Sequence, residues 1–276
     1  MPKNKILVLI CYYGHFPWYF SYFLHSCNFN PTIDFLIFSD IKADFELPEN
    51  LKIVNKSIGD IKELLWKRIG VVANIDHPYK LCDFKPSYGL IFEDYIKRYD
   101  FWGQSDLDII YGNIRWFMTD ELLDSYDFIS VRHDYTTGCF ALYRNNPQMN
   151  SIFMRSRDYK KVFSSPDHFC FDECNFAWDK LTAGASIFDL KTEIESFTHV
   201  IKAAEKSGEI KAHFDFIIME GNTGRLIFDN GRIVYKGQFE AMLFHLFWLK
   251  KLYAPKHIPK KIPDKYYISK TRIYHH

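Results

Sequence analysis

The sequence predicts a mixed α/β fold with a mainly parallel sheet flanked by helices and a small antiparallel part. Two observations carry this prediction. In the first third of the chain, short apolar segments rich in β-branched residues alternate with longer segments whose apolar residues recur at helical spacing. Farther along, segments that alternate apolar and polar residues are joined by Asp229–Asn230–Gly231, a turn sequence typical of an antiparallel hairpin.

The composition is that of a folded protein and excludes several classes. The chain has 276 residues, a net charge of +1, and 47% hydrophobic and 25% charged residues, which suits one large domain or two small ones. A charge near zero argues against a protein that coats nucleic acid. The six cysteines form no CxxC pair, so we expect reduced thiols in a cytoplasmic protein. The apolar run at 6–10 is too short for a secretory signal, and no run of about 18 apolar residues predicts a transmembrane helix.

The first third of the chain alternates predicted strands and helices. Residues 6–11 (ILVLIC), 33–38 (IDFLIF) and 51–55 (LKIVN) are short and apolar, which is typical of buried parallel strands. Aromatic residues at helical spacing predict a helix over 16–27, and an apolar face predicts another over 58–69.

The rest of the chain continues this alternation and then changes to antiparallel strands. After Pro255 the chain becomes basic and its hydrophobic periodicity fades. The further predicted elements are helices over 87–99 and 149–163, strands over 127–131 and 139–143, and alternating strands over 214–218, 225–228 and 232–235.

The most informative polar feature is the acidic pair in Ser105–Asp106–Leu107–Asp108. Two carboxylates two residues apart point to the same side of an extended backbone. At the end of a parallel strand they face the crevice in which open α/β sheets bind ligands. Hard divalent cations take carboxylate oxygens together with phosphate oxygens, so we interpret Asp106 and Asp108 as metal ligands. The alternative is a solvated loop or a helix cap, because Asp before a turn is a favoured cap.

Three blocks around this pair resemble a known family: Lys85–Gly89 (KPSYG), Tyr99–Gly103 (YDFWG) and Asp106–Gly112 (DLDIIYG). Over residues 78–145 the chain resembles bacterial GT-A-fold glycosyltransferases of capsule or lipopolysaccharide synthesis, which carry KPxYG, YDFWG and DxDxxxG blocks. The resemblance implies a GT-A-like nucleotide-sugar transferase fold. It also implies that Asp106 and Asp108 hold Mn²⁺ or Mg²⁺ on the diphosphate of a nucleotide sugar.

A late motif extends the resemblance. Retaining GT-A enzymes carry HFxGxxKPW, whose His is a third metal ligand and whose Lys meets the diphosphate. Here His245 and Lys251 keep the spacing, although the Gly and the Pro-Trp are absent. The resemblance therefore implies that His245 binds the metal, for which neutral imidazole is a suitable ligand, and that Lys251 binds phosphate. The alternative is a helix over 239–252 whose His faces its neighbours without a metal.

Five further residues are candidates for the donor nucleotide. Lys85 lies near a predicted helix start, where anions bind, and the resemblance places its block beside the donor; the alternative is a solvated lysine. Tyr12, Tyr13 and Gly14 follow the first strand, and the resemblance places the nucleotide base there. The ring of Tyr12 or Tyr13 is expected to stack on the base, and the alternative is that it packs in the core. Asp40 ends the second strand and is placed to accept hydrogen bonds from base or ribose, or to serve as a turn residue.

The acceptor side is predicted from two segments. Asp172 and Glu173 resemble the acidic pair on the acceptor side of many GT-A folds, where a catalytic carboxylate orients or deprotonates a hydroxyl. The alternative is a helix cap with an acidic first turn. Residues 136–140 resemble the segment that approaches the acceptor, and Gly138 allows close approach of the backbone to a ligand.

These expectations combine into one functional hypothesis. Residues 1–254 are expected to form one GT-A-like domain with a nucleotide-sugar-binding half (1–112) and an acceptor half (113–254), followed by a basic tail (255–276). The expected reaction moves a hexosyl group from a nucleotide-diphosphate sugar, with a UDP-sugar favoured, to a hydroxyl of a glycan or lipid-linked glycan. The tail is expected to contact anionic lipid at the inner face of the membrane or to stay solvated, and no nucleic acid is expected. A nucleotidyltransferase on the same fold and a non-catalytic sugar- or partner-binding module stay open.

Overall fold

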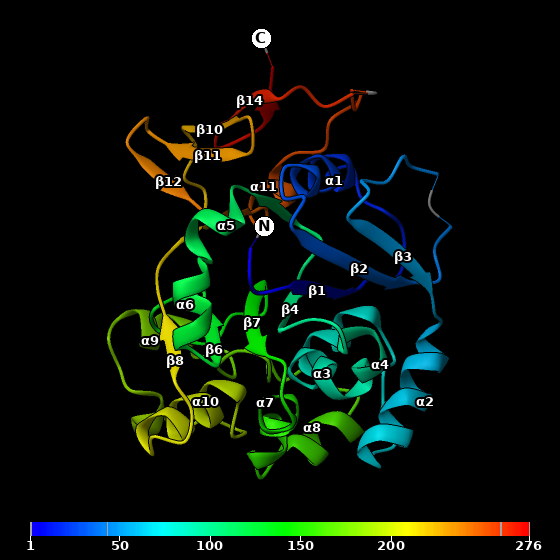
Figure 1. Cartoon of the computed structure of the whole chain (residues 1–276), viewed down its shortest axis with the longest axis vertical. Coiled ribbons are helices and arrows are strands. Elements are labelled where there is room, and N and C mark those ends of the chain that lie inside the picture. The colour runs from blue at the N-terminus through cyan, green and yellow to red at the C-terminus, as the bar shows by residue number, and fades with distance from the viewer. Residues whose placement is uncertain (1, 43, 260, 276) are drawn as a thin grey trace.

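The main sheet of the protein is a mixed, mainly parallel one, as predicted. The computed structural model describes residues 2–42, 44–259 and 261–275, and in this part the main sheet has seven strands in the order β3-β2-β1-β4-β7-β6-β8 (Figure 1). Strand β7 runs antiparallel to β4 and β6, and the other neighbours are parallel. The strands are β1 (Ile6–Cys11), β2 (Ile33–Ser39), β3 (Leu51–Asn55), β4 (Phe101–Ser105), β6 (Phe128–Ser130), β7 (Phe140–Arg144) and β8 (Ala212–Phe214).

Helices cover both faces of this sheet, and the central strand shows why. Along β1, Leu7 and Leu9 enter the core shared with η1, α3 and α8, whereas Val8 and Ile10 enter the core shared with α1 and α5. Figure 1 shows α1 on one side of the strands and α2, α3, α4 and α8 on the other. The helices are α1 (Phe20–Asn28), α2 (Ile58–Ile69), η1 (Pro78–Ser87), α3 (Tyr88–Ile91), α4 (Glu93–Ile96), α5 (Ile114–Phe117), α6 (Asp120–Ser125), α7 (Pro147–Ser151), η2 (Ile152–Arg155), α8 (Tyr159–Ser164), α9 (Trp178–Thr182), η3 (Ile187–Asp189), α10 (Phe197–Lys206) and α11 (Leu249–Leu252).

Two smaller sheets lie beside the main one. The predicted hairpin turn is present, with φ of 48° at Asn230 and 81° at Gly231, the backbone that such a two-residue turn requires. A five-stranded antiparallel sheet contains β12 (Phe239–Ala241), β11 (Arg232–Tyr235), β10 (Leu226–Asp229), β14 (Lys265–Ile268) and β15 (Ile273–Tyr274), in that order. A three-stranded sheet contains β5 (Ile109–Tyr111), β13 (Leu243–His245) and β9 (Ile218–Met219).

Several predicted elements differ from those observed. The expected helices over 87–99 and 149–163 are each broken into short helices. The alternative of a helix over 239–252 is wrong, because Leu243 and Phe244 are buried in strand pairings with β5 and β9 that no local pattern reveals. Instead of one strand over 214–218, β8 ends at residue 214 beside β6 and β9 begins at 218 in another sheet.

The two predicted halves of the domain and the segment after residue 254 all contribute strands to sheets that they share with other parts of the chain. Strands from both predicted halves, 1–112 and 113–254, lie in the main sheet. Within the segment 255–276, the described residues 265–268 and 273–274 belong to the five-stranded sheet, because β14 pairs with β10 and β15 with β14. Lys260, one of the basic residues of that segment, lies outside the described residues. Among the described helices, none has the length and apolar character needed to cross a membrane.

Candidate functional site

The acidic pair occupies the link between β4 and β5. Leu107 is 3% exposed and packs into the core beside Ile109, so the alternation of the chain turns Asp106 and Asp108 to the opposite side. The Asp106 side chain is 27% exposed and that of Asp108 is 8% exposed. The link therefore presents one partly open and one nearly buried carboxylate at the end of a central strand.

His245 joins this pair because β13 lies against β5. His245 is in register with Ile109, and the next backbone N–H, of Leu246, donates to the carbonyl of Asp108 at 2.8 Å. One ligand atom from each of Asp106, Asp108 and His245 lies within 4.8 Å of the other two. Two carboxylates supply the oxygen ligands that hard divalent cations take, and the imidazole adds a nitrogen ligand suited to a transition-metal ion, so these residues fit Mn²⁺ better than Mg²⁺.

The His245 imidazole and the Asp108 carboxylate stabilise each other's charged forms. Burial alone would lower the pKa of His245, but the charge of Asp108 and the hydrogen bond to it raise that pKa to about 10. Burial alone would raise the pKa of Asp108, but His245 and then Lys250 hold it well below its usual range. Without a cation, the cluster is therefore balanced by positive groups of the protein itself.

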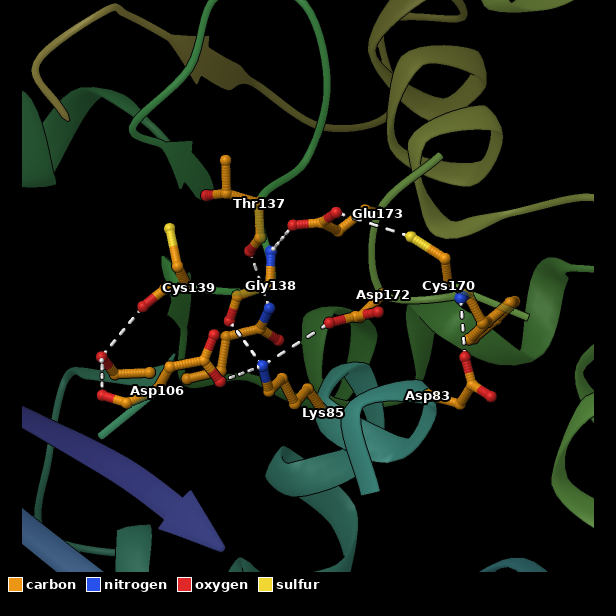
Figure 2. Close-up of polar contacts among 12 residues, drawn as sticks. Asp83, Lys85, Asp106, Thr137, Gly138, Cys139, Cys170, Asp172 and Glu173 are labelled. Atoms are coloured by element: carbon orange, nitrogen blue, oxygen red, sulfur yellow. Dashed lines mark hydrogen bonds and ion pairs between the residues drawn. The ribbon is translucent and has the colours of Figure 1, made fainter. Parts of the chain in front are cut away.

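Two lysine amines contact the acidic pair. Lys85 Nζ, which is buried, donates to Asp106 Oδ1 at 2.5 Å and to the Gly138 carbonyl at 2.9 Å, and lies 3.6 Å from Asp172 Oδ2 (Figure 2). Burial lowers the pKa of Lys85, but the charges around it, Asp106 first, raise it well above its usual value. On the other side, Lys250 Nζ donates to Asp108 Oδ2 at 2.6 Å.

The lysine chosen by motif spacing is not the one that reaches the acidic pair. The amine of Lys251 lies 3.6 Å from the centre of the Phe247 ring and 5.0 Å from that of Trp248. The short helix α11 turns its neighbour, Lys250, toward Asp108 instead. A one-residue difference on a helix changes direction by about 100°, and the absent Gly and Pro-Trp of the motif were the only signal of the change.

Asp172 and Glu173 lie in a loop next to Lys85 but have different surroundings. Glu173 accepts hydrogen bonds from the Gly138 N–H at 2.8 Å and from Trp178 Nε1 at 2.6 Å, so both of its carboxylate oxygens hold the local structure. Asp172 is buried, and burial raises the pKa of its carboxyl well above the usual range although Lys85 opposes this. Figure 2 shows its carboxylate turned toward Lys85. Of Asp172 and Glu173, Asp172 is therefore the one that faces Lys85 and, through it, Asp106.

Gly138 is required where these segments meet. A Cβ atom at this position would lie 2.3 Å from Asp172 Oδ2, which is too close, and 3.2 Å from Glu173 Oε1, which is a tight contact. Any side chain here would have to displace the Asp172 carboxylate, and glycine lets the 136–140 segment lie against both carboxylates as they are. The close approach at Gly138 is thus to the carboxylates of Asp172 and Glu173, whereas approach to a ligand was expected.

The residues after β1 and β2 are divided between core and surface. Tyr13 is 6% exposed and belongs to the hydrophobic core, so its ring packs there instead of facing a ligand. Tyr12 is half-buried, its ring stacks on Phe16, and burial followed by the charge of Asp108 raises its pKa. Gly14 has a φ of 113°, in the region that favours glycine, and Asp40 is exposed. Of the two tyrosines, Tyr12 is thus the one whose pKa is influenced by the acidic centre.

A second group of charges lies behind His245 and was not predicted from the sequence. Glu220 follows β9, and its carboxylate lies between His245 and Arg132. Arg132 is in turn paired with Asp134. Glu220 is far from both Arg132 and His245 in the sequence and shares no motif with them, so only the pairing of β9 with β13 reveals that they lie together.

The fold and this site define a class: an α/β protein with an Asp-Asp-His cluster of cation-ligand type at the end of a central strand. The chain belongs to a family described as a family of unknown function (DUF6625), whose model matches residues 8–276. No curated protein matches the chain.

Solved structures similar to this chain include glycosyltransferases. The galactosyltransferase LgtC in complex with donor and acceptor sugar analogues is 8% identical, with 79% of this chain and 76% of that chain covered and a TM-score of 0.37. An active-site mutant of LgtC is 9% identical, with the same coverage and TM-score. Mouse xyloside xylosyltransferase 1 in its apo form is 9% identical, with 87% and 96% covered and a TM-score of 0.43.

Proposed function

We propose that this protein is a metal-dependent glycosyltransferase. It moves a hexosyl group from a nucleotide-diphosphate sugar, with a UDP-sugar favoured, to a hydroxyl of a glycan or lipid-linked glycan in bacterial surface polysaccharide synthesis. The observation that carries the proposal is the Asp106–Asp108–His245 cluster flanked by the amines of Lys85 and Lys250. A divalent cation ligand set next to two ammonium groups is the chemistry that a diphosphate requires.

The chain's own residues have defined roles in this proposal. Asp106, Asp108 and His245 hold Mn²⁺ or Mg²⁺, which when bound neutralises charge on the diphosphate leaving group. Lys85 and Lys250 exchange their carboxylate partners for phosphate oxygens and stabilise the negative charge that develops there. The proposal assigns phosphate binding to Lys250 in place of Lys251, because the Lys250 amine faces the centre.

The proposal also gives roles to residues predicted for the donor nucleotide and the acceptor. The proposal places the nucleotide base against Tyr12 and Gly14, with Asp40 at the end of β2 as a hydrogen-bond acceptor for base or ribose. Asp172, rather than Glu173, is the carboxylate that orients the acceptor hydroxyl, because Glu173 is occupied by Gly138 and Trp178. A buried carboxyl with a raised pKa next to a lysine is typical of such acid–base groups.

The acceptor side of the proposal includes a membrane surface. Trp248, Leu252 and Ile258 are exposed apolar side chains that lie in sequence among exposed lysines, including Lys251 and Lys256. Basic side chains attract anionic headgroups, and exposed tryptophan suits the interface between headgroups and acyl chains. We propose that this surface holds the protein at the inner face of the membrane, where a lipid-linked acceptor is found.

The test is a thermal-shift panel on protein stripped with EDTA. UDP, GDP, CMP and dTDP are each added with and without Mn²⁺ to wild type, Asp108→Asn and Asp229→Asn. Asp229→Asn is a matched control, because Asp229 also pairs with a lysine, Lys265, at 3.1 Å, but lies in the five-stranded sheet. A ligand at about 100 times its Kd stabilises the folded state by about 2.7 kcal/mol, which is a readily measured shift.

The expected result is a Mn²⁺-dependent shift with one nucleotide that is lost in Asp108→Asn and kept in Asp229→Asn. The matching nucleotide sugar is then incubated with acceptor glycan, and release of the nucleoside diphosphate identifies glycosyl transfer. Release of pyrophosphate from a nucleoside triphosphate would instead identify a nucleotidyltransferase. Sugar binding without any metal-dependent nucleotide shift would overturn the proposal in favour of a non-catalytic binding module.

A further inference from the structure

The two ring nitrogens of His245 face two different carboxylates. Nε2 lies 3.4 Å from Asp108 Oδ2, and Nδ1 lies 3.6 Å from Glu220 Oε1. Nε2 is therefore the nitrogen on the side of the acidic pair, and Nδ1 points away from it. An imidazole that binds a cation through one nitrogen carries its proton on the other, and that proton needs an acceptor.

Glu220 is brought to this place by strand pairing. Met219 of β9 is in register with Phe244 of β13, so the residue that follows β9 lies beside His245. The Glu220 side chain is 29% exposed, whereas that of His245 is 16% exposed. The carboxylate is thus a partly covered group behind the cluster, on the side of the ring opposite to Asp108.

The Glu220 carboxylate is itself held in place. Its Oε2 accepts a hydrogen bond from Arg132 Nη1 at 2.9 Å. Arg132 also donates to both oxygens of Asp134, at 2.8 and 2.6 Å, and Asp134 accepts a further hydrogen bond from Thr182 at 2.8 Å. A planar guanidinium bound at two edges fixes its partners more strictly than a flexible lysine does. Arg132 and Asp134 thus form a rigid clamp behind Glu220.

We infer that Glu220 is a positioning residue for the metal ligand His245. It accepts the Nδ1 proton of His245, and this fixes the tautomer and the rotation of the ring so that Nε2 is presented to the cation held by Asp106 and Asp108. Arg132 orients the carboxylate from behind. The inference rests on the proposed metal site, and it adds residues that touch neither the cation nor the substrate.

A competing role for Glu220 is that of a direct ligand. Atoms of Cys139, Glu220 and His245 also lie within 4.8 Å of one another. Burial raises the pKa of the Cys139 thiol well above its usual value, so the thiolate that a metal site would need is disfavoured there. The Arg132 hydrogen bond already occupies one Glu220 oxygen. The two roles differ in whether the charge of Glu220 or only its acceptor oxygen matters.

The test is the affinity for Mn²⁺ alone, measured without nucleotide from the electron paramagnetic resonance signal of free Mn²⁺. Glu220→Ala should bind Mn²⁺ about 10- to 100-fold more weakly, as expected for loss of a carboxylate behind a ligating histidine. Glu220→Gln keeps an acceptor oxygen for Nδ1–H and should recover most of this loss. Glu240→Ala is the matched control, since Glu240 also accepts from an arginine, Arg232, at 2.7 Å, and it should bind as wild type does.

The outcomes separate this inference from the proposed function. If Asp108→Asn weakens Mn²⁺ binding but Glu220→Ala does not, the metal site stands and the positioning role is overturned. If Glu220→Gln loses as much affinity as Glu220→Ala, the charge matters and Glu220 is a ligand, which also overturns the inference. If Asp108→Asn leaves Mn²⁺ binding unchanged, the proposed metal site itself is wrong. Thermal melting of each variant without metal shows that a loss is not caused by unfolding.

Discussion

Replacing Asp83 with Asn should destabilise this protein far more than the same replacement at Asp94. Each carboxylate pairs with a lysine three residues away, Asp83 with Lys80 at 2.8 Å and Asp94 with Lys97 at 2.6 Å. The side chains of the first pair are 0% exposed, whereas those of the second are 68% exposed for Lys97 and 60% for Asp94. The two variants therefore make the same chemical change in opposite surroundings.

The buried pair is fully engaged by its surroundings. Asp83 accepts hydrogen bonds from the backbone N–H groups of Phe169, at 3.0 Å, and Phe171, at 2.8 Å. Lys80 also donates to the carbonyls of Val162 and Asp167, at 2.8 and 2.5 Å. This network fastens η1, which carries Lys85, to the loop that carries Asp172. An Asn at position 83 leaves the Lys80 charge buried and without its counter-charge.

Removing one partner of a buried ion pair costs about 3–5 kcal/mol of folding free energy, whereas exposed ion pairs contribute little. Urea unfolding followed by circular dichroism measures both variants, and an unchanged slope shows that the change is in stability. Asp83→Asn should lower the urea midpoint strongly and Asp94→Asn only slightly. Equal shifts of the two midpoints would refute the reasoning, because they would mean that burial does not set the cost of the unpaired charge.

Two further predictions concern pH and lipid. Burial would raise the pKa of Asp83, but His168 and then Lys80 lower it overall. The Asp83 carboxylate therefore stabilises the folded protein fully above the ordinary carboxyl pKa of about 3.9. This stabilisation is lost as the pH falls through the lower pKa of the folded state. Between about pH 5 and about pH 2 the wild-type urea midpoint should therefore fall more steeply than that of Asp83→Asn, and parallel curves would contradict this. In sedimentation with vesicles, the protein should bind anionic but not neutral lipid, and Lys251→Gln and Lys256→Gln should each weaken binding about fivefold; equal binding to both lipids would contradict the membrane proposal.

The sequence predicted the features that depend on local spacing. Alternation along 105–108 predicted that the Asp106 and Asp108 carboxylates point to the same side of the backbone, and ligand atoms of the two lie within 4.8 Å of each other. The apolar run of β1 identified a strand buried on both faces. No local pattern predicts that His245 lies close to Asp106 and Asp108, and this closeness was expected only from resemblance to a late motif.

The parts that could not be predicted depend on tertiary pairing. Lys250 rather than Lys251 meets Asp108, because the orientation of α11 is set by the burial of Leu249 rather than by motif spacing. Glu220 and Arg132 are ordinary charged residues in the sequence, and only the pairing of β9 with β13 reveals their relation to His245. A pattern within about ten residues contains no information on such contacts.

Because β5 pairs with β13, the Asp106–Asp108–His245 cluster can form only late in the translation of these residues. A ribosome that has translated half of the chain has already produced Asp106, Asp108 and Lys85, but Glu220, His245 and Lys250 are still to come. The emerging N-terminal half can begin to fold as a sheet while it still lacks His245. The nascent protein therefore brings Asp106, Asp108 and His245 together only after residues 243–245 have been made and have paired with β5. Chains that stop before residue 243 contain the acidic pair but not the strand that brings His245 to it.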